Sequence, residues 1–273
     1  MAYADTGAGA PLLLVHGWAA HGGFFADLSQ RLSQSNRVLV PTLRGHHGSG
    51  HGAAPLSIET LADDIAHFLE TLDLRGVTAL GWSMGAMALW QAYPRLAGRL
   101  SGLIVEEMAP RLTNDGGWSF GIAGNYRAED IAVTLSEIRA DWPAYVSRFA
   151  PRMFAPSARA RTPELVEWAG AEMAKADPEA MAQFWGSMAA QDFRGRLSSI
   201  TTPMLVMQGA ESQVYPEGAT AFVANAAPLG AHAIIPGAGH VPHLEAPEAF
   251  FQQVEAFVRN QRRPELRSGG AVP

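Results

Sequence analysis

The sequence predicts an α/β fold: a mostly parallel central sheet flanked by helices, with a helical cap inserted into it. Two observations predict the sheet. Short apolar runs are typical of strands buried on both faces, and helical patterns alternate with these runs, as in parallel β-α-β units. The third observation predicts the cap. From Arg111 to about Arg196, helical periodicity continues without a strong strand pattern.

Six segments carry the strand pattern. They are Pro11–Val15, Arg37–Val40, Val77–Trp82, Leu103–Val105, Pro203–Gly209 and Ala231–Ile235. Helices are expected at Phe24–Leu32, after a capping Ser57, after Ser83, at Pro216–Ala226, and from Pro247 to about Asn260. We therefore expect an α/β core from residues 1–110 and 197–263, a cap from 111–196, and a frayed tail from 264–273.

Composition excludes several classes of protein. The chain has 273 residues, of which 48% are hydrophobic, enough for one large domain with an insertion. A formal net charge of −6 argues against a nucleic-acid binder. The absence of cysteine excludes disulfides and thiolate catalysis, and it fits a reducing compartment, so we expect a cytoplasmic location. We find neither a signal-peptide pattern nor an apolar run of membrane-spanning length.

The segment Gly81-Trp82-Ser83-Met84-Gly85 is a Gly-x-Ser-x-Gly pattern. An apolar run precedes it and a helix-forming run follows it, which is the strand–turn–helix context of a nucleophile elbow. The two glycines lack Cβ atoms and so allow a sharp turn. Ser83 would stand at that turn, near a helix N-terminus that favours developing negative charge. Ser83 is therefore the candidate nucleophile.

A serine hydroxyl is a weak nucleophile and needs a base within hydrogen-bond reach. His240 is the candidate, because it follows the last predicted strand in a glycine-flanked loop, at the sheet edge where ligands bind. It also follows the nucleophile in chain order. We interpret the nearby His243 as a loop residue.

The first predicted strand ends in His16-Gly17-Trp18. When a nucleophile elbow is present, the loop after such a strand supplies one backbone N–H to the oxyanion hole, and the residue after the nucleophile supplies another. We therefore expect the N–H groups of Trp18 and Met84 to be the two donors. We interpret His16 as a residue that braces the loop. The Trp18 side chain could also line a substrate pocket.

Three histidines lie in the loop Pro41–His51. No acidic residue lies among them and their spacing is not that of one helical face, so we expect a solvated turn rather than a metal site. The hydrolytic chemistry expected at Ser83 needs no metal or organic cofactor.

The predicted cap is rich in large apolar side chains, and we expect some of them to line an apolar substrate pocket. They are Trp118, Phe120, Trp142, Phe149, Phe154, Trp168, Phe184, Trp185 and Met188. The cap also carries a basic stretch with a single acid, Asp141. Its arginines are Arg139, Arg148, Arg152, Arg159 and Arg161. Such a patch on an acidic protein could dock an acidic partner.

Taken together, the motifs resemble those of the α/β-hydrolase superfamily, with the cap inserted after the strand that follows the elbow. The matching pieces span nearly the whole core. They are His16–Trp18, Leu43–His46, Gly81–Gly85 and Gly239-His240 followed by Glu245 and Pro247. Within the superfamily, the short N-terminus, the His-Gly-Trp loop, the Gly-Trp-Ser-Met-Gly elbow and Asp192-Phe193-Arg194 resemble the pimeloyl-[acyl-carrier-protein] methyl ester esterases of biotin synthesis.

The resemblance implies a serine carboxylesterase that hydrolyses a carboxylic ester through an acyl-enzyme. Its substrate would be a small-molecule ester. The resemblance also implies that the ester is carried on an acyl carrier protein that binds through Arg139, Arg148, Arg152 and Arg159. The same scaffold also supports C–C hydrolases, lactonases and perhydrolases. A non-catalytic ligand receptor on this scaffold is a further alternative.

The sequence departs from the family at the acid of the triad. The family usually places this acid three residues after the glycine that ends the strand Pro203–Gly209, and here that position is Ser212. We prefer Glu107, at the end of the strand beyond the nucleophile, over Glu211, with Glu106 third. If none of these carboxylates contacts His240, the enzyme would work as a weakened dyad.

Overall fold

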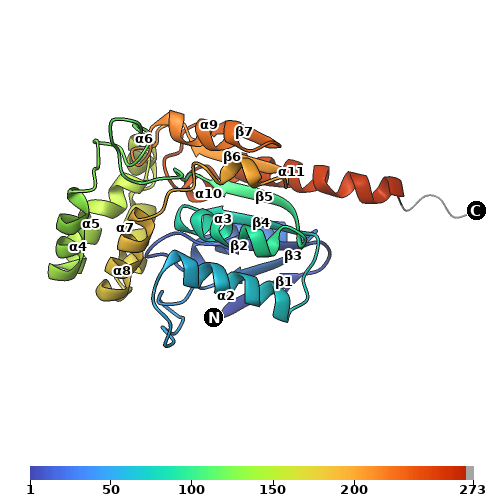
Figure 1. Cartoon of the computed structure of the whole chain (residues 1–273), viewed down its shortest axis with the longest axis horizontal. Coiled ribbons are helices and arrows are strands. Elements are labelled where there is room, and N and C mark those ends of the chain that lie inside the picture. Colours follow the sequence, from blue (N-terminus) through green and yellow to red (C-terminus); the bar gives the residue numbers. More distant parts are fainter. Residues whose placement is uncertain (269–273) are drawn as a thin grey trace, which may run out of the picture.

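The computed structural model describes residues 1–268 and contains one seven-stranded sheet (Figure 1). The strand order across the sheet is β1-β3-β2-β4-β5-β6-β7. The bounds are β1 Tyr3–Gly7, β2 Pro11–Val15, β3 Arg37–Pro41, β4 Val77–Trp82, β5 Leu100–Glu106, β6 Met204–Gly209 and β7 Gly230–Ile235. All neighbouring pairs are parallel except β1 and β3. The predicted α/β class with a mostly parallel sheet is confirmed.

β1 was not predicted. It pairs antiparallel with β3, from Tyr3 opposite Pro41 to Gly7 opposite Arg37. All five of its residues are exposed, so the segment shows neither the apolar run nor the alternation that identifies a strand. Backbone pairing holds β1 in place, together with an ion pair between Arg37 and Asp5.

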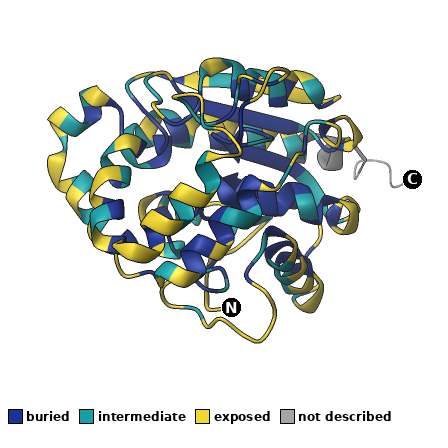
Figure 2. Cartoon of the chain, turned by 60° about the vertical axis from the view of Figure 1, so that its left-hand side comes forward, coloured by how far each residue is buried: buried dark blue, intermediate teal, exposed yellow. Residues whose placement is uncertain are grey.

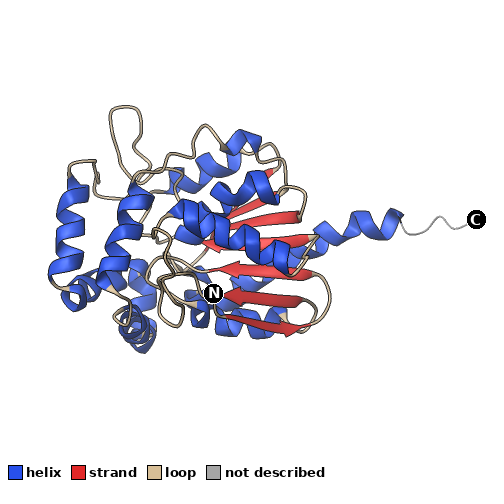
Figure 3. Ribbon diagram, turned by 60° about the horizontal axis from the view of Figure 1, so that its bottom comes forward, coloured by secondary structure: helices blue, strands red, loops and turns tan. Residues whose placement is uncertain are grey.

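Helices cover the sheet on both faces (Figure 3). Helix α1 packs against α11, and α2 packs against α3. The bounds are α1 Ala26–Leu32, α2 Ile58–Thr71, α3 Met84–Leu96, α9 Glu217–Ala226 and α11 Pro247–Ser268. Ser57 caps α2 as predicted, because its hydroxyl accepts from the Thr60 N–H.

Two helix boundaries differ from the predictions. The segment expected as one helix from Phe24 begins with a 3₁₀ turn, Gly22–Phe25, before α1. The closing helix continues to Ser268, where we expected an end near Asn260 and a frayed tail from 264. Residues 269–273 of that predicted tail lie outside the described residues.

The cap stands to the left of the sheet in Figure 1, between β5 and β6 in the chain. Its helices are α4 Asp130–Ala140, α5 Trp142–Met153, α6 Pro156–Arg161, α7 Pro163–Met173 and α8 Pro178–Ala189. Asp141 and Asp177 cap α5 and α8 by accepting backbone N–H bonds, so helix-start signals are present in the sequence. Residues 111–129 approach the cap without a helix.

The middle strands of the sheet form the buried centre of the molecule (Figure 2). β4 and β6 are buried along their whole length, which explains their continuous apolar character. Within residues 1–268, no helix combines the length and the apolar character that crossing a membrane requires.

A buried polar pair fastens the last loop to the middle of the sheet. Glu106, the last residue of β5, accepts hydrogen bonds from the backbone N–H and the Nδ1 of His243, at 3.1 and 2.7 Å. His243 lies in a short helix, α10 Pro242–Glu245, and packs against Trp82 and Phe25. Both side chains of the pair are fully buried, so interpreting His243 only as a loop residue understated its role.

We expect His243→Ala to destabilise the protein by roughly 3–5 kcal/mol, because Glu106 would keep a buried carboxylate without its imidazole partner. Urea unfolding followed by circular dichroism measures this loss. His67→Ala, at an exposed position of α2, is the matched control and should change stability by less than about 0.5 kcal/mol. Equal effects of the two variants would show that the buried pair does not stabilise the fold.

Candidate active site

Ser83 stands at a strained turn between β4 and α3. Its backbone has φ 52° and ψ −120°, a region that residues with a Cβ rarely occupy. The Ser83 N–H donates to the Glu106 carbonyl oxygen at 2.9 Å, which fixes the turn to the end of the neighbouring strand β5. The predicted strand–turn–helix context is therefore present, and it places the hydroxyl on the wall of a cavity.

Gly85 lets α3 approach β2 closely. A Cβ at this position would overlap the carbonyl oxygen of Val15, so no larger residue fits without a backbone shift. Gly17 faces the elbow from the other side, and an added Cβ would lie 3.3 Å from the Ser83 Cβ. The glycines thus bring the loop after β2 against the serine.

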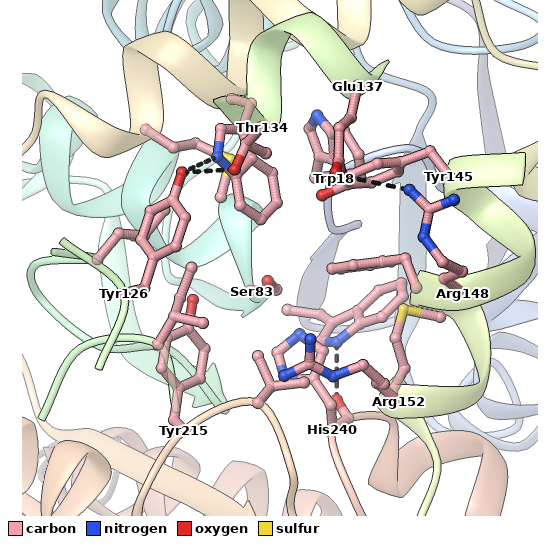
Figure 4. A pocket seen from close by; sticks show the side chains of 18 residues that line it. Trp18, Ser83, Tyr126, Thr134, Glu137, Tyr145, Arg148, Arg152, Tyr215 and His240 are labelled. Carbon is pink, nitrogen blue, oxygen red and sulfur yellow. Dashed lines mark hydrogen bonds and ion pairs between the residues drawn. The ribbon is translucent and has the colours of Figure 1, made fainter. Parts of the chain in front are cut away.

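His240 lies on the same cavity as Ser83, in the loop after β7 (Figure 4). Three contacts fix its position. Its N–H donates to the Met153 carbonyl at 2.6 Å, and its carbonyl accepts from the Trp82 Nε1 at 2.9 Å. Its Nδ1 lies 3.5 Å from the Glu107 Oε1, and both side chains are buried. That distance is long for a hydrogen bond, and such contacts often tighten when a substrate binds.

A second carboxylate, Glu245, shapes the loop around His240. It accepts the N–H groups of Gly239 and Val241 at 2.8 and 3.2 Å, and the N–H of Ala155 in the cap at 2.6 Å. Burial raises the pKa of the Glu245 carboxyl. The Glu245 side chain therefore fixes the backbone on both sides of His240.

Glu107 follows β5 directly and has a positive φ of 42°. Glu107 is thus the second residue of the site in a strained backbone conformation, and its carboxylate faces His240. Its carboxylate also accepts a hydrogen bond from the Ser212 hydroxyl and a longer one, 3.4 Å, from the Gly209 N–H. Burial raises the pKa of Glu107, while contact with His240 and these two donors acts in the opposite direction.

The other two candidate acids point elsewhere. Glu211 accepts from the Ser157 hydroxyl at 2.7 Å and the Ser157 N–H at 3.4 Å, at the start of α6. Glu106 is engaged with His243. Of the three carboxylates considered, Glu107 alone is brought to His240.

The loop after β2 holds its shape through His16. The His16 Nε2 accepts the Leu43 N–H at 2.9 Å, so its Nδ1 carries the proton and donates to the Gly17 carbonyl at 2.8 Å. Burial, together with the nearby His46, lowers the pKa of His16 well below its ordinary value. A neutral, buried His16 therefore braces the loop, as the sequence predicted.

The backbone N–H of Trp18 belongs to the loop after β2, whose Gly17 packs against Ser83, and that of Met84 belongs to the first residue of α3, next to Ser83. Among residues 1–268, neither N–H takes part in a hydrogen bond with the protein. Two unpaired donors beside a nucleophile can stabilise an oxyanion. The Trp18 side chain lines the cavity, and its Nε1 donates to the Met181 carbonyl in α8.

The histidine-rich loop differs from its prediction at one residue. His47 and His51 are exposed, but His46 is buried against His16 and Phe184. Burial lowers its pKa to about 4. Across residues 1–268, no group of three His, Asp or Glu side chains is arranged to hold a metal ion.

The cavity beside Ser83 has a volume of about 440 Å³ and lies between core and cap (Figure 4). Its walls are mostly apolar and aromatic. The wall residues are Trp18, Trp82, Leu112, Ile122, Tyr126, Tyr145, Phe149, Met153, Trp185, Met188, Val214 and Tyr215. Three of the cap side chains predicted to be available for a pocket, Phe149, Trp185 and Met188, line it.

The remaining predicted cap residues pack within the cap or against the core, for example Trp142 stacked on Tyr145 and Phe154 fully buried. No sequence pattern indicated that three tyrosines line the cavity. A tyrosine signals no particular site in a sequence, and Tyr215 reaches this one only because β6 lies beside β5.

Charged residues also line the cavity, and all of them come from the cap. Glu137 and Arg148 form an ion pair at 3.2 Å, and Arg152 makes no ion pair with a carboxylate among the described residues. Of the other cap arginines, Arg139 pairs with Glu179, and Arg159 donates to the Gln213 side chain.

Relatives with known names share this architecture. A pimeloyl-[acyl-carrier protein] methyl ester esterase of Photobacterium profundum is 28% identical to this chain over 263 residues, covering 95% of this chain and 98% of the relative. A solved thermophilic esterase of Thermogutta terrifontis is 27% identical, with a TM-score of 0.85, covering 95% and 93% of the two chains.

An esterase of Exiguobacterium antarcticum superposes with a TM-score of 0.87 over 94% of both chains; at 24% identity it supports the fold alone. The family model described as "Alpha/beta hydrolase family" matches residues 12–253. These matches confirm the resemblance found in the sequence motifs. Because the model spans most of its length, this chain belongs to the alpha/beta hydrolase family.

Proposed function

We propose that this chain is a serine carboxylesterase that hydrolyses a carboxylic ester through an acyl-enzyme. One observation carries the proposal: Ser83 and His240 line one cavity, and Glu107 lies 3.5 Å from the His240 Nδ1. The three come from distant parts of the chain and follow the order nucleophile, acid, base.

In the proposed reaction, the Ser83 Oγ attacks the ester carbonyl while the His240 Nε2 takes its proton. The N–H groups of Trp18 and Met84 stabilise the oxyanion. His240 then gives the proton to the departing alkoxide, and an alcohol leaves. Water, deprotonated by His240, attacks the acyl-enzyme and releases the acid. Glu107 orients His240 and stabilises its charged form.

Glu107 takes the role that the family usually gives to an acid at position 212. Ser212 keeps a part in the arrangement, because its hydroxyl donates to the Glu107 carboxylate. The absence of an acid at position 212 favoured a non-catalytic receptor. With Glu107 as the acid, this argument for a receptor no longer applies. C–C hydrolysis, lactone opening and perhydrolysis use the same scaffold, and nothing specific in the cavity favours them.

For the substrate, we propose the methyl ester of a medium-length acyl chain carried on an acyl carrier protein, as in biotin synthesis. The name of the Photobacterium profundum relative supports this choice. The apolar cavity would take the acyl chain, and the cap arginines would contact the acidic carrier. Arg152, Arg159 and Arg161 make no ion pair with carboxylates among the described residues, so they are the best placed to do so. A cytoplasmic location stays a prediction.

Ser83→Ala should reduce kcat for short-chain esters by a factor on the order of 10⁶, because no other group supplies the nucleophile. A serine-directed phosphonate should label the wild-type protein and leave this variant unlabelled. Ser147→Ala, at an exposed serine of α5, is the control and should behave as wild type. Retained turnover in Ser83→Ala, or a wild-type protein that neither reacts nor hydrolyses, would contradict the proposal.

Glu107→Gln should lower kcat by about 10⁴, because a neutral amide cannot hold the imidazole in the required tautomer or stabilise its charge. Glu211→Gln is the matched control and should leave kcat nearly unchanged. Adding Ser212→Asp to Glu107→Gln should restore part of the lost rate from the family's usual position. If Glu211→Gln is the damaging change, or both variants stay active, Glu107 is not the acid. Thermal unfolding of each variant checks its folding.

Arg159→Ala should raise KM for a carrier-bound methyl ester several-fold and leave the kinetics of the free methyl ester unchanged. The preference for the carrier-bound ester should also weaken as salt is added. Arg75→Ala, at an exposed residue that pairs with Asp73 far from the cap in the chain, is the matched control. Equal rates on carrier-bound and free esters in the wild type would argue against carrier docking while leaving the esterase proposal intact.

A further inference from the structure

Tyr215 is a buried phenol beside the proposed base. It lies in the segment between β6 and α9, and its ring packs edge-on against the His240 ring with centroids 5.8 Å apart. It is 3% exposed and lines the cavity. In Figure 4 its hydroxyl is directed toward the middle of the cavity, where Ser83 lies.

The Tyr215 hydroxyl has a weak partner. It donates to the Met108 Sδ at 3.3 Å, and among residues 1–268 it makes no other hydrogen bond. The Ser83 Oγ donates to the same sulfur at 3.9 Å. A thioether is a poor acceptor, so both hydroxyls can exchange it for an oxygen of a bound molecule at little cost.

The environment keeps the phenol protonated. Burial raises the pKa of Tyr215, and the nearby Glu107 carboxylate acts in the same direction. The side chain is therefore a hydrogen-bond donor at every pH at which the enzyme would work. The two proposed oxyanion donors belong to the loop after β2 and to α3, whereas Tyr215 lies in the segment that follows β6.

We propose that Tyr215 donates a hydrogen bond to the alcohol oxygen of the ester and so stabilises the departing alkoxide. The inference rests on the proposed esterase function. In that mechanism His240 protonates the departing oxygen, which must then lie beside the imidazole. Tyr215 packs against His240, and its hydroxyl donates to the same sulfur as the Ser83 hydroxyl, whereas the Trp82 indole N–H is already bonded to the His240 carbonyl. This hydrogen bond should raise the rate most for esters whose alcohol is a poor leaving group.

The step balances without any additional reactant. The bond from the Ser83 Oγ to the carbonyl carbon forms, and the Ser83 proton moves to His240. The bond from that carbon to the alkoxy oxygen then breaks, and the oxygen takes the proton from His240. Tyr215 keeps its own proton and only shares it in the hydrogen bond.

Tyr215→Phe removes the hydroxyl and keeps the ring, and it leaves only a sulfur without its donor. We expect kcat/KM for a methyl ester to fall about 10- to 100-fold. For the p-nitrophenyl ester of the same acid it should change less than about twofold, since nitrophenolate needs little stabilisation. kcat/KM is the informative quantity, because it reports acylation, the step in which the alcohol leaves.

Tyr145→Phe is the matched control, because Tyr145 lines the cavity from α5 and its hydroxyl makes no hydrogen bond among residues 1–268. Tyr145→Phe should change kcat/KM for the methyl ester and for the p-nitrophenyl ester by the same factor. A Tyr215→Phe variant that is unchanged on both esters, or slowed equally on both, would overturn the inference. A wild-type enzyme inactive on both esters would instead contradict the esterase function. Unfolding temperatures confirm that the variants are folded.

Discussion

The contact between the Glu107 carboxylate and the His240 imidazole is the constraint on which the site depends. It joins the end of β5 to a loop that follows β7, across the whole length of the cap in the chain. The close approach requires glycine at position 209, where a Cβ would overlap the carbonyl oxygens of Ala238 and Gly239. The parallel sheet brings the residue after β5 and the loop after β7 to the same edge. Backbone packing at that edge sets the distance between Glu107 and His240.

A buried carboxylate is costly unless its oxygens are paired, and Glu107 is contacted by three residues from two segments, the end of β6 with the turn after it and the loop after β7. Ser212 is the most informative of these. If both positions carried acids, two carboxylates would compete for one imidazole and repel each other in a buried site. A hydroxyl at 212 avoids that repulsion and stabilises the charge of Glu107. If Glu107 is the acid of the triad, as we propose, the departure from the family pattern places the acid directly after β5 and a hydrogen-bond donor at position 212.

The parts of the structure with a local signal could be predicted from sequence. Ser83 is recognisable because strand, turn and helix follow one another within a few residues, and His240 because a glycine-flanked loop follows the last strand. The choice among the three glutamates could only be ranked, since it depends on the φ of Glu107 and on how far the loop after β6 turns. β1 could not be predicted because it has no apolar pattern. The contact between Tyr215 and Met108 arises from packing between segments far apart in the chain. Such contacts leave no trace in the spacing of residues.

The cap is more than a cover for the cavity, because it fixes the proposed base. The Met153 carbonyl of α5 accepts the His240 N–H, and the Ala155 N–H that follows α5 donates to Glu245, which ends α10 directly after that loop. A displacement of α5 would therefore move a cavity wall and loosen His240 at once. Arg148 and Arg152 stand on this same helix, so any partner that contacts them acts on an element bonded directly to the His240 loop. Helix α5 thus carries both cavity-lining arginines and a hydrogen bond to the loop of the proposed base.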